Sequence, residues 1–374
     1  MWFNSLLLCL GVNMAVKTPT FKLTIGAVDF SILKLKKYIQ SIEVEMTSDG
    51  PSTFKIVLDD CDKIFSGGAE CVIREGDSCV ISLGFIETQV TQMIQGIVTG
   101  VKANRKEYSR MYYEISGMDG LQALTRGKKR RSWENIKISD IAGTIANECS
   151  LQPDCEDSGE VLPFVVQNNL TDLKFLMEQA AMIGFEVKVE EKRLVFKKPV
   201  KIDTGLILTM KPKNSSSFAE NECMLQRCNL NSSTMQVVNK VVVRWYDEKQ
   251  AKAIIAECSK IDDKMGGKET AAEHAEANNP DTTIQISDTP VYSQAQAEAL
   301  ASAVLNKRAD YYLTGSGTCE GNPKLKCGAK VKIANVGKEM DGEYYITKAK
   351  HSMKVGNGQD YGYWTEFEVS RSAR

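Results

Sequence analysis

The sequence has almost no net charge and very little histidine. Its 47 lysines and arginines are balanced by 48 aspartates and glutamates, which leaves a net charge of −1. Such a chain has no overall field to concentrate nucleic acid or an anionic membrane, so binding of that kind would depend on a local patch. The two histidines, His274 and His351, leave few imidazole ligands for a metal site.

Long hydrophobic runs are also missing. The most apolar stretch, MWFNSLLLCLGV at the N-terminus, is too short to span a bilayer. It lacks the flanking basic residue and the small-residue cleavage site of a secretory signal. Because Met14 opens MAVKTPTF, we expect residues 1–18 to be an extension that is disordered or arises from a misassigned start codon, with a real anchor as the alternative. We therefore expect a protein made in the cytoplasm.

What the chain does contain is typical of a globular protein with several domains. Its 374 residues exceed the usual size of one domain, and 43% hydrophobic with 25% charged residues argue against wholesale disorder. Eleven cysteines are spread along the chain and do not form a dense, even-numbered framework. We interpret them as mostly reduced thiols.

Short alternating apolar runs fill residues 19–125. Period-two alternation is typical of antiparallel strands with one buried face, and many short strands favour a barrel or a sandwich. We predict a first β-barrel domain over 19–125. The runs are FKLTI, SIEVEM, STFKIVL, CVISLGF, QMIQGIVTGVKA and MYYEISG.

Helical spacing replaces this pattern over 126–200. Two apolar stripes at helical spacing predict two helices, the first with Ser139 as its N-cap and the second ended by Gly184 in a left-handed conformation. An alternating hairpin follows, so the sequence predicts a small α+β domain. The stripes are Ile138, Ile141, Ala142, Ile145 and Ala146, and then Leu173, Leu176, Met177 and Ala180.

Strand-like patterning returns over 201–374 and predicts a second β-barrel domain. The runs GLILTM, MLQRCNLNSS, NKVVVRWYD, AKVKIANV, GEYYITKAKHSM and YGYWTEFEVSR are its expected strands. A polar and helical insertion at 248–312 interrupts them; its polar tract reads as a mobile surface excursion. The insertion ends in a helix whose capping box is formed by Ser293 and Gln296.

The glycine-rich stretch GSGTCEGNPKLKCGAKVKI, residues 315–333, is the first candidate for a site. Its glycine spacing and the helix before it do not fit a phosphate loop, so we interpret Gly315 and Gly317 as the end of that helix. The seven residues between Cys319 and Cys327 exceed the spacing of a zinc knuckle. A disulfide between these two cysteines would need an oxidising compartment. Cys223 and Cys228 are the best remaining pair for zinc, but no partner ligands are evident.

The sequence contains no convincing group of catalytic residues. His351 lies near a strand end, where a lone histidine is usually a hydrogen-bonded structural residue. Paired carboxylates such as Glu190 with Glu191 stand in polar surroundings that would not raise a pKa for acid catalysis. We expect no catalytic, cofactor-binding or metal-binding residues.

One local basic patch stands out. The run RGKKRRSWEN is either a charged connector between domains, a contact for an acidic protein partner or, less favoured, a polyanion-binding element. The candidate contact residues are Arg126, Lys128, Lys129, Arg130 and Arg131.

Taken in order, three segments resemble the tail hub proteins of phages and contractile injection systems, the group of the phage late control D proteins and the N-terminal part of VgrG. They are NLTDLKFLMEQAAMIGFEVKVEEKRLVFKK, the glycine-rich stretch above, and DGEYYITKAKHSM followed by GYWTEFEVSR. Positions that match the family pattern include Asp172, Leu173, Gly184, Gly317, Gly321, Pro323, Gly328, Gly342, His351 and Thr365.

The resemblance implies two β-barrel tube-type domains flanking a small α+β domain, with a helical insertion in the second barrel. It implies a non-enzymatic baseplate hub that forms a homotrimer, joins the inner tube to a separate spike protein and is assembled into a phage tail or injection particle. Neither nucleic acid binding nor membrane insertion is expected. The alternatives left open are a tail-associated cell-wall or glycan hydrolase and a polyanion-binding module that acts through residues 126–131.

Overall fold

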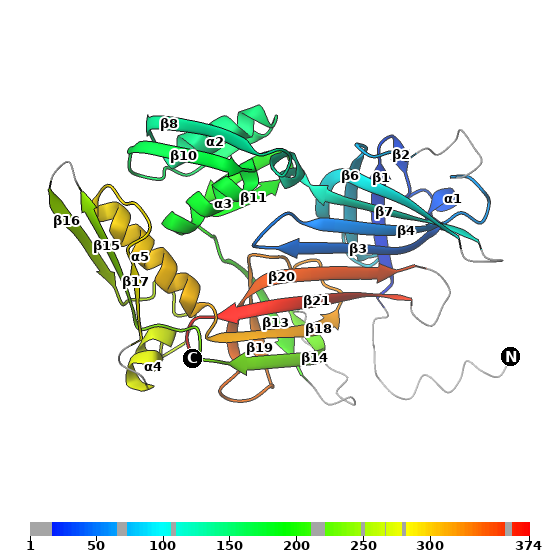
Figure 1. Ribbon diagram of the computed structural model, residues 1–374. Helices are drawn as coiled ribbons and strands as arrows, with labels where there is room; N and C mark the ends of the chain where they lie inside the picture. Colours follow the sequence, from blue (N-terminus) through cyan, green and yellow to red (C-terminus); the bar gives the residue numbers. More distant parts are fainter. Residues whose placement is uncertain are drawn as a thin grey trace.

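The chain folds mainly into β-strands, most of which belong to one continuous sheet. The computed structural model describes residues 17–65, 73–105, 110–210, 221–247, 251–265, 267–278, 282–355 and 361–374. Thirteen strands pair in the order β19-β13-β14-β18-β21-β20-β3-β4-β7-β6-β5-β1-β2 and run through two β units (Figure 1). No helix in these described ranges is long and apolar enough to cross a membrane.

The first β unit forms where the alternating runs predicted it. Its strands are antiparallel neighbours, and the sheet curls around a core of the inward-facing apolar side chains. Across the described residues no ladder joins β1 to β3, so hydrogen bonds do not close this unit into a barrel. Its elements are β1 (Pro19–Ile25), β2 (Val28–Asp29), α1 (Leu33–Lys36), β3 (Ile39–Thr47), β4 (Thr53–Asp59), β5 (Ser78–Phe85), β6 (Thr91–Arg105), β7 (Met111–Asp119) and η1 (Gly120–Leu124).

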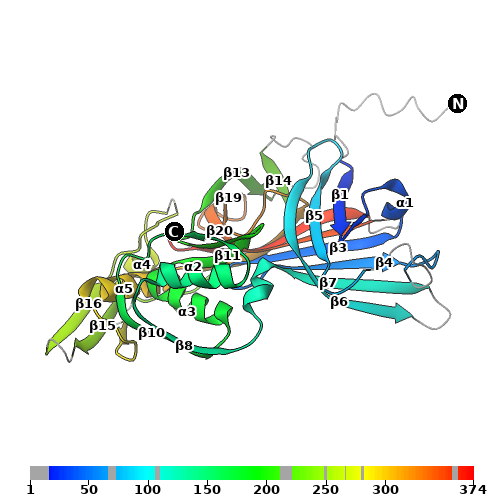
Figure 2. The same ribbon diagram turned by 90° about the horizontal axis from the view of Figure 1, so that it is seen from above.

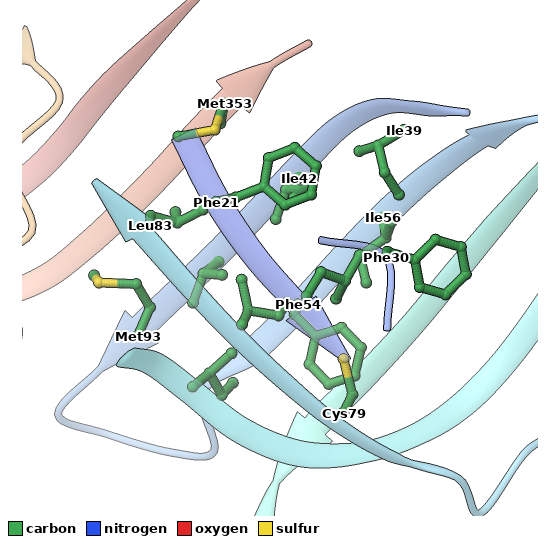
Figure 3. Packing of buried hydrophobic residues seen from close by; sticks show 14 of the residues in the cluster. Phe21, Phe30, Ile39, Ile42, Phe54, Ile56, Cys79, Leu83, Met93 and Met353 are labelled. Carbon is green, nitrogen blue, oxygen red and sulfur yellow. The ribbon is translucent and has the colours of Figure 1, made fainter. Parts of the chain in front are cut away.

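The core of the first unit includes residues from the far end of the chain. Phe21, Ile42 and Phe54 are almost fully buried there, and Met353 reaches into the same cluster (Figure 3). Met353 lies on β20, a strand of the second β unit that pairs directly with β3. The two units therefore share one sheet and part of one hydrophobic core.

The second β unit is a closed six-stranded barrel. Its strands follow the order β19-β13-β14-β18-β21-β20, and β19 also pairs with β20, which closes the circle. This architecture confirms the mainly β fold with a closed barrel. Its strands are β13 (Ile202–Thr209), β14 (Glu222–Ser232), β18 (Leu313–Glu320), β19 (Ala329–Ala334), β20 (Gly342–Lys354) and β21 (Gly362–Arg371).

The interpretation of Gly315 and Gly317 as a helix end is wrong, because both lie inside β18. The preceding helix ends at Ala309, and Asp310 is its C-cap. A Cβ atom at Gly315 would overlap Leu230, and one at Gly317 would overlap the ring of Phe367. These glycines allow neighbouring strands and side chains to approach closely. In the sequence alone, such glycines resemble those of a turn.

The small α+β unit contains both predicted helices and more strands than predicted. The helices α2 (Ile138–Glu148) and α3 (Asp172–Ile183) bury the expected stripes, and Gly184 caps α3 with a φ of 70°. The N-cap of α2 is Lys137 and not Ser139, whose backbone N–H instead donates to Ser158 Oγ. The strands are β8 (Lys129–Ile136), β9 (Gln152–Cys155), β10 (Leu162–Leu170), β11 (Glu186–Glu190) and β12 (Arg193–Lys197).

These strands form two layers around the helices. β9, β12 and β11 form one small sheet, and β8 pairs with β10 in a separate antiparallel ribbon. Figure 2 shows α2 and α3 between β11 and the β8–β10 ribbon. One face of this ribbon therefore packs on the helices, and the other faces away from them.

The insertion is a folded α/β unit and not the mobile excursion that its polar composition suggested. The strand at 240–247, which we expected in the second barrel, pairs with two strands of the polar tract instead. The inward face of this sheet packs on α5, and α5 lies at the end of the molecule opposite the first β unit (Figure 1). Its elements are β15 (Lys240–Asp247), β16 (Lys252–Cys258), α4 (Ala271–Asn278), β17 (Thr283–Ile286) and α5 (Gln294–Ala309).

The apolar residues of this unit are few, which explains why we did not predict its strands from the sequence. Five residues spread over two short strands provide the apolar face of β16 and β17 in the described chain: Ile254, Ala256, Cys258, Ile284 and Ile286. Their burial depends on the opposing stripe of α5, which begins at Ser293 as predicted: the Ser293 side chain accepts a hydrogen bond from the backbone N–H of Gln296. A short strand with two buried residues has a weak periodic signal.

Candidate functional site

The outer face of the continuous sheet extends over both β units. Eight neighbouring strands, β14-β18-β21-β20-β3-β4-β7-β6, cross from the second β unit into the first without a break. Side chains on a strand alternate between its two faces. The apolar half of each strand fills the cores, so the polar half is brought together on one outer face.

Charged side chains of opposite sign meet on this outer face. The register places Lys350 between Glu366 of β21 and Glu45 of β3, and Lys348 beside Glu368. Lys348 Nζ lies 2.8 Å from Glu45 Oε1. Two further ion pairs continue the pattern, Lys350 with Glu43 at 3.3 Å and Lys55 with Glu114 at 3.0 Å. The face is therefore strongly polar but close to neutral.

A shallow groove lies over β18 on this face. Its volume is about 340 Å³, and it forms where the small side chains of β18 separate the longer ones of β14 from those of β20 and β21. Its walls carry cations and anions together with hydroxyl groups. The lining residues are Glu45, Arg227, Asn229, Ser316, Gly317, Thr318, Lys348, Lys350, Glu366, Phe367 and Glu368.

Two strands of the continuous sheet also have an open stretch along one edge. Among the described residues, 99–105 of β6 pair only with β7, because β5 pairs with β6 no further than Ile97. At the other end, residues 225–232 of β14 pair only with β18 in the described chain, since β13 reaches β14 no further than Met224. An open edge presents unpaired backbone N–H and C=O groups to another strand.

The five residues of the basic run do not share one side of the α+β unit, because side chains alternate between the two faces of β8. Lys129 and Arg131 face the helices, where both bind the buried carboxylate of Asp172 at 2.7 and 2.8 Å. Arg131 also stacks on Trp133 and binds Glu148 at 2.7 Å. Hydrogen bonds to Asp172 raise the pKa of Lys129. These two cations hold the α+β unit together.

The other three residues of the run point outward. Arg126, Lys128 and Arg130 are exposed and form no ion pair within the part of the chain that the structure describes. The structure thus does not bring all five predicted contact residues to one surface. A surface contact through this run would use these three.

His351 is a buried hydrogen-bonded residue. Its Nε2–H donates to the carbonyl of Leu325 at 2.8 Å, and its Nδ1 accepts from Tyr363 Oη at 2.8 Å. Thr365 Oγ1 lies 3.1 Å from the same Nδ1. Burial lowers the pKa of the imidazole to about 4. The ring is therefore neutral at pH 7 and fixes the loop around Leu325 to the barrel.

The cysteines that the structure describes are all free thiols. Cys319 and Cys327 do not form a disulfide with each other. Cys319 lies on β18 next to Cys223 on the paired strand β14. The thiol of Cys327 donates to the carbonyl of Thr347 at 3.2 Å. Burial raises the pKa of Cys327 to about 12 and that of Cys155 to about 11. Within the described ranges, no group of three or more His, Cys, Asp or Glu side chains could hold a metal ion.

The charged outer face is the feature that the sequence reasoning missed. Its signal was present as alternating charges in SIEVEM, in TKAKHSMK and in TEFEVS. Each segment was interpreted only as a strand with one buried face. The pairing of β20 with β3, which joins these charges into one surface, links residues about 300 positions apart in the chain and has no local signature.

Comparison with known families identifies the chain. The model of the Alg8 N-terminal domain family matches residues 17–354. The chain belongs to this family. None of the curated proteins matches this member of the Alg8 N-terminal domain family.

Solved structures share the fold of this Alg8 N-terminal domain family member. The 43 kDa tail protein of prophage MuSo2 from Shewanella oneidensis superposes with a TM-score of 0.69 at 14% identity, over 95% of this chain and 98% of that one. A tail protein of Neisseria meningitidis gives 0.64 at 12% identity, over 95% and 97%. The Escherichia coli c3393 protein, described as a component of the type VI secretion system, gives 0.56 at 14% identity over 94% and 77%. The fold is therefore that of phage tail and secretion-system proteins, as the resemblance predicted.

Proposed function

We propose that this protein is a non-enzymatic baseplate hub of a phage tail or contractile injection system, in which three copies form a ring that joins the inner tube to the spike. One observation carries the proposal: eight neighbouring strands of the continuous sheet cross both β units, and the outermost two of the eight, β6 and β14, each have a stretch that pairs with one neighbour only in the described chain. Because the two edges differ, we expect a head-to-tail contact between one edge of a copy and the other edge of the next. Such contacts give a closed ring when the rotation from copy to copy adds up to a full turn.

The chemistry of the outer face suits the inner wall of such a ring. Pairing β6 of one copy with β14 of the next would continue the sheet, and the charged face would then form an uninterrupted polar surface. A wall with balanced charges stays hydrated and does not attract one sign of cargo strongly. Tail and secretion-system proteins with the same fold support this role.

Native mass spectrometry of the purified full chain tests the ring. We expect a species of three times 41.4 kDa, alone or after co-expression with candidate tube and spike proteins. A protein that stays monomeric alone and in the presence of those proteins would refute the hub.

Photo-crosslinking tests the two edges directly. A photoreactive amino acid at Ala103 on β6 should cross-link to residues 225–232 of another copy, and the same group at Lys192, an exposed position of the α+β unit, should not. A trimer in which Ala103 cross-links elsewhere would keep the ring but overturn the head-to-tail pairing.

A further inference from the structure

A second exposed surface lies on the β8–β10 ribbon, away from the continuous sheet. Phe164 and Val166 of β10 are each 44% exposed although they are large apolar side chains. Their neighbours Val165 and Gln167 alternate inward and are buried. The ribbon therefore carries apolar side chains on both faces, and among the described elements only its inner face has a covering layer (Figure 2).

Basic residues continue this apolar surface along the ribbon. The register pairs Val166 with Ser132 and Asn168 with Arg130, so Arg130 is the diagonal neighbour of Val166, about 7–8 Å away between Cα atoms. Lys128, one residue before the strand, is also exposed. We call Lys128, Arg130, Phe164 and Val166 the ribbon face.

We propose that the ribbon face binds an extended acidic segment of another protein, with a large apolar side chain of that segment against Phe164 and Val166. The cations have no ion pair in the described chain, so carboxylates of a partner would meet charges that are not already neutralised. The apolar pair adds the contact area that charge alone does not provide.

Nucleic acid fits this face less well than an acidic protein segment. Glu134 stands directly opposite Phe164 across the ribbon, so a phosphate near the aromatic ring would meet a carboxylate. Two of the five cations in the run are bound to Asp172 on the opposite side and cannot contribute. The proposal is independent of the ring, because none of these residues lies on the continuous sheet.

Fluorescence anisotropy with labelled peptides tests the proposal on the full chain. The probes are a short peptide with the repeat Glu-Ser-Leu-Ser, which places glutamate and leucine on the same face of an extended chain, one with lysine for glutamate and one with serine for leucine. We expect the protein to bind the first probe at low salt and to bind the other two at least about tenfold more weakly. No binding of the first probe refutes the proposal.

Matched variants locate the binding on the ribbon face. K128E/R130E and F164S/V166S should each weaken binding of the glutamate–leucine peptide about tenfold or more. K192E/K198E makes the same charge change at two exposed lysines of the same unit and should leave binding unchanged. Circular dichroism confirms that each variant is folded. Equal affinity of wild type and both ribbon variants would refute the assignment.

Two other results would replace the proposed partner. If a single-stranded oligonucleotide displaces the peptide and its own binding is unaffected by F164S/V166S, the face is a purely electrostatic polyanion site. If sedimentation shows a self-association that F164S/V166S abolishes, the ribbon face is an interface between copies of this chain. Either result overturns the acidic-segment proposal and leaves the hub untouched.

Discussion

Single glycines determine how closely side chains pack in the second barrel. At Gly321, an added Cβ would overlap the ring of Tyr363, and at Gly317 it would overlap Phe367. We expect Gly317→Ala and Gly321→Ala each to lower the free energy of unfolding by about 1–3 kcal/mol, because a packed core tolerates added volume poorly. Urea denaturation followed by the fluorescence of Trp364, on the neighbouring β21, measures the change.

Gly143 provides a control of the same chemical type. It lies inside α2, where an added Cβ would be 3.8 Å from the nearest atom, in Pro153. Gly143→Ala should therefore be stabilising by about 0.5–1 kcal/mol, since alanine favours the helix. Equal effects of the three substitutions would contradict the packing explanation.

His351 makes the stability of the second barrel depend on pH. The folded-state pKa of about 4 lies below the ordinary value of 6.5, so the unfolded chain binds the proton more tightly. Above pH 6.5 His351 is neutral in both the folded and the unfolded chain, and protonation costs no stability. As the pH falls from 6.5 to about 4, the unfolded chain takes up the proton first, and the free energy of unfolding falls by about 3 kcal/mol in total.

A substitution separates this effect from other titrating groups. His351→Gln keeps a donor and an acceptor but cannot be protonated, so it should be less stable than wild type at pH 7.5 and lose less stability on acidification. Urea denaturation at several values between pH 7.5 and 4.5 gives the comparison. Parallel curves for the two proteins would mean that His351 does not carry the dependence.

At the scale of elements, β8 is fixed to α3 by charge. Arg131 and Lys129 neutralise Asp172, whose side chain is only 3% exposed and also accepts from Gln167 Nε2 at 2.9 Å. Arg131→Ala should cost about 2 kcal/mol, because it leaves a buried carboxylate with one cation fewer.

The adjacent residue is the matched control for that prediction. Arg130→Ala removes the same charge from the outward side of the same strand and should change the unfolding free energy by less than about 0.5 kcal/mol. Thermal unfolding followed by the fluorescence of Trp133, also on β8, would show the difference. Similar losses for Arg130→Ala and Arg131→Ala would show that the run acts as one exposed patch.

At the scale of the whole molecule, the two β units should open together. They share the β20–β3 ladder, Met353 in the first core, and a hydrogen bond from Lys326 Nζ to the carbonyl of Gln92 at 2.8 Å. Met353→Ala should therefore lower the opening free energy of both units by about 2–5 kcal/mol.

Hydrogen exchange with mass spectrometry can check that coupling. Peptides from β3 and β4 and peptides from β20 and β21 should lose protection by the same amount in Met353→Ala. Peptides from α2 and α3, which belong to a different core, should lose less. If only the β20 and β21 peptides respond, the two β units are independent despite their shared sheet.

The sequence by itself determined the strands and helices whose periodicity is strong. Every predicted strand of the first unit, both stripes of α2 and α3, and the caps at Gly184 and Ser293 follow from local spacing, because these features depend on neighbours a few residues away. The resemblance to tail proteins came from the segment of α3 and its hairpin and from two segments of the second β unit. Of residues 1–18, which were predicted to be an extension, residues 1–16 lie outside the described residues.

Only the tertiary structure decided how these elements join. The pairing of β20 with β3, the separate sheet of β15 to β17 and the place of Gly317 inside β18 depend on contacts between distant segments. Arg131 and Arg130 have different surroundings only because the helices cover one face of β8 and leave the other exposed. Long-range pairing leaves no periodic signal in a single chain, so the charged face and the ribbon face became visible only when the strands were placed side by side.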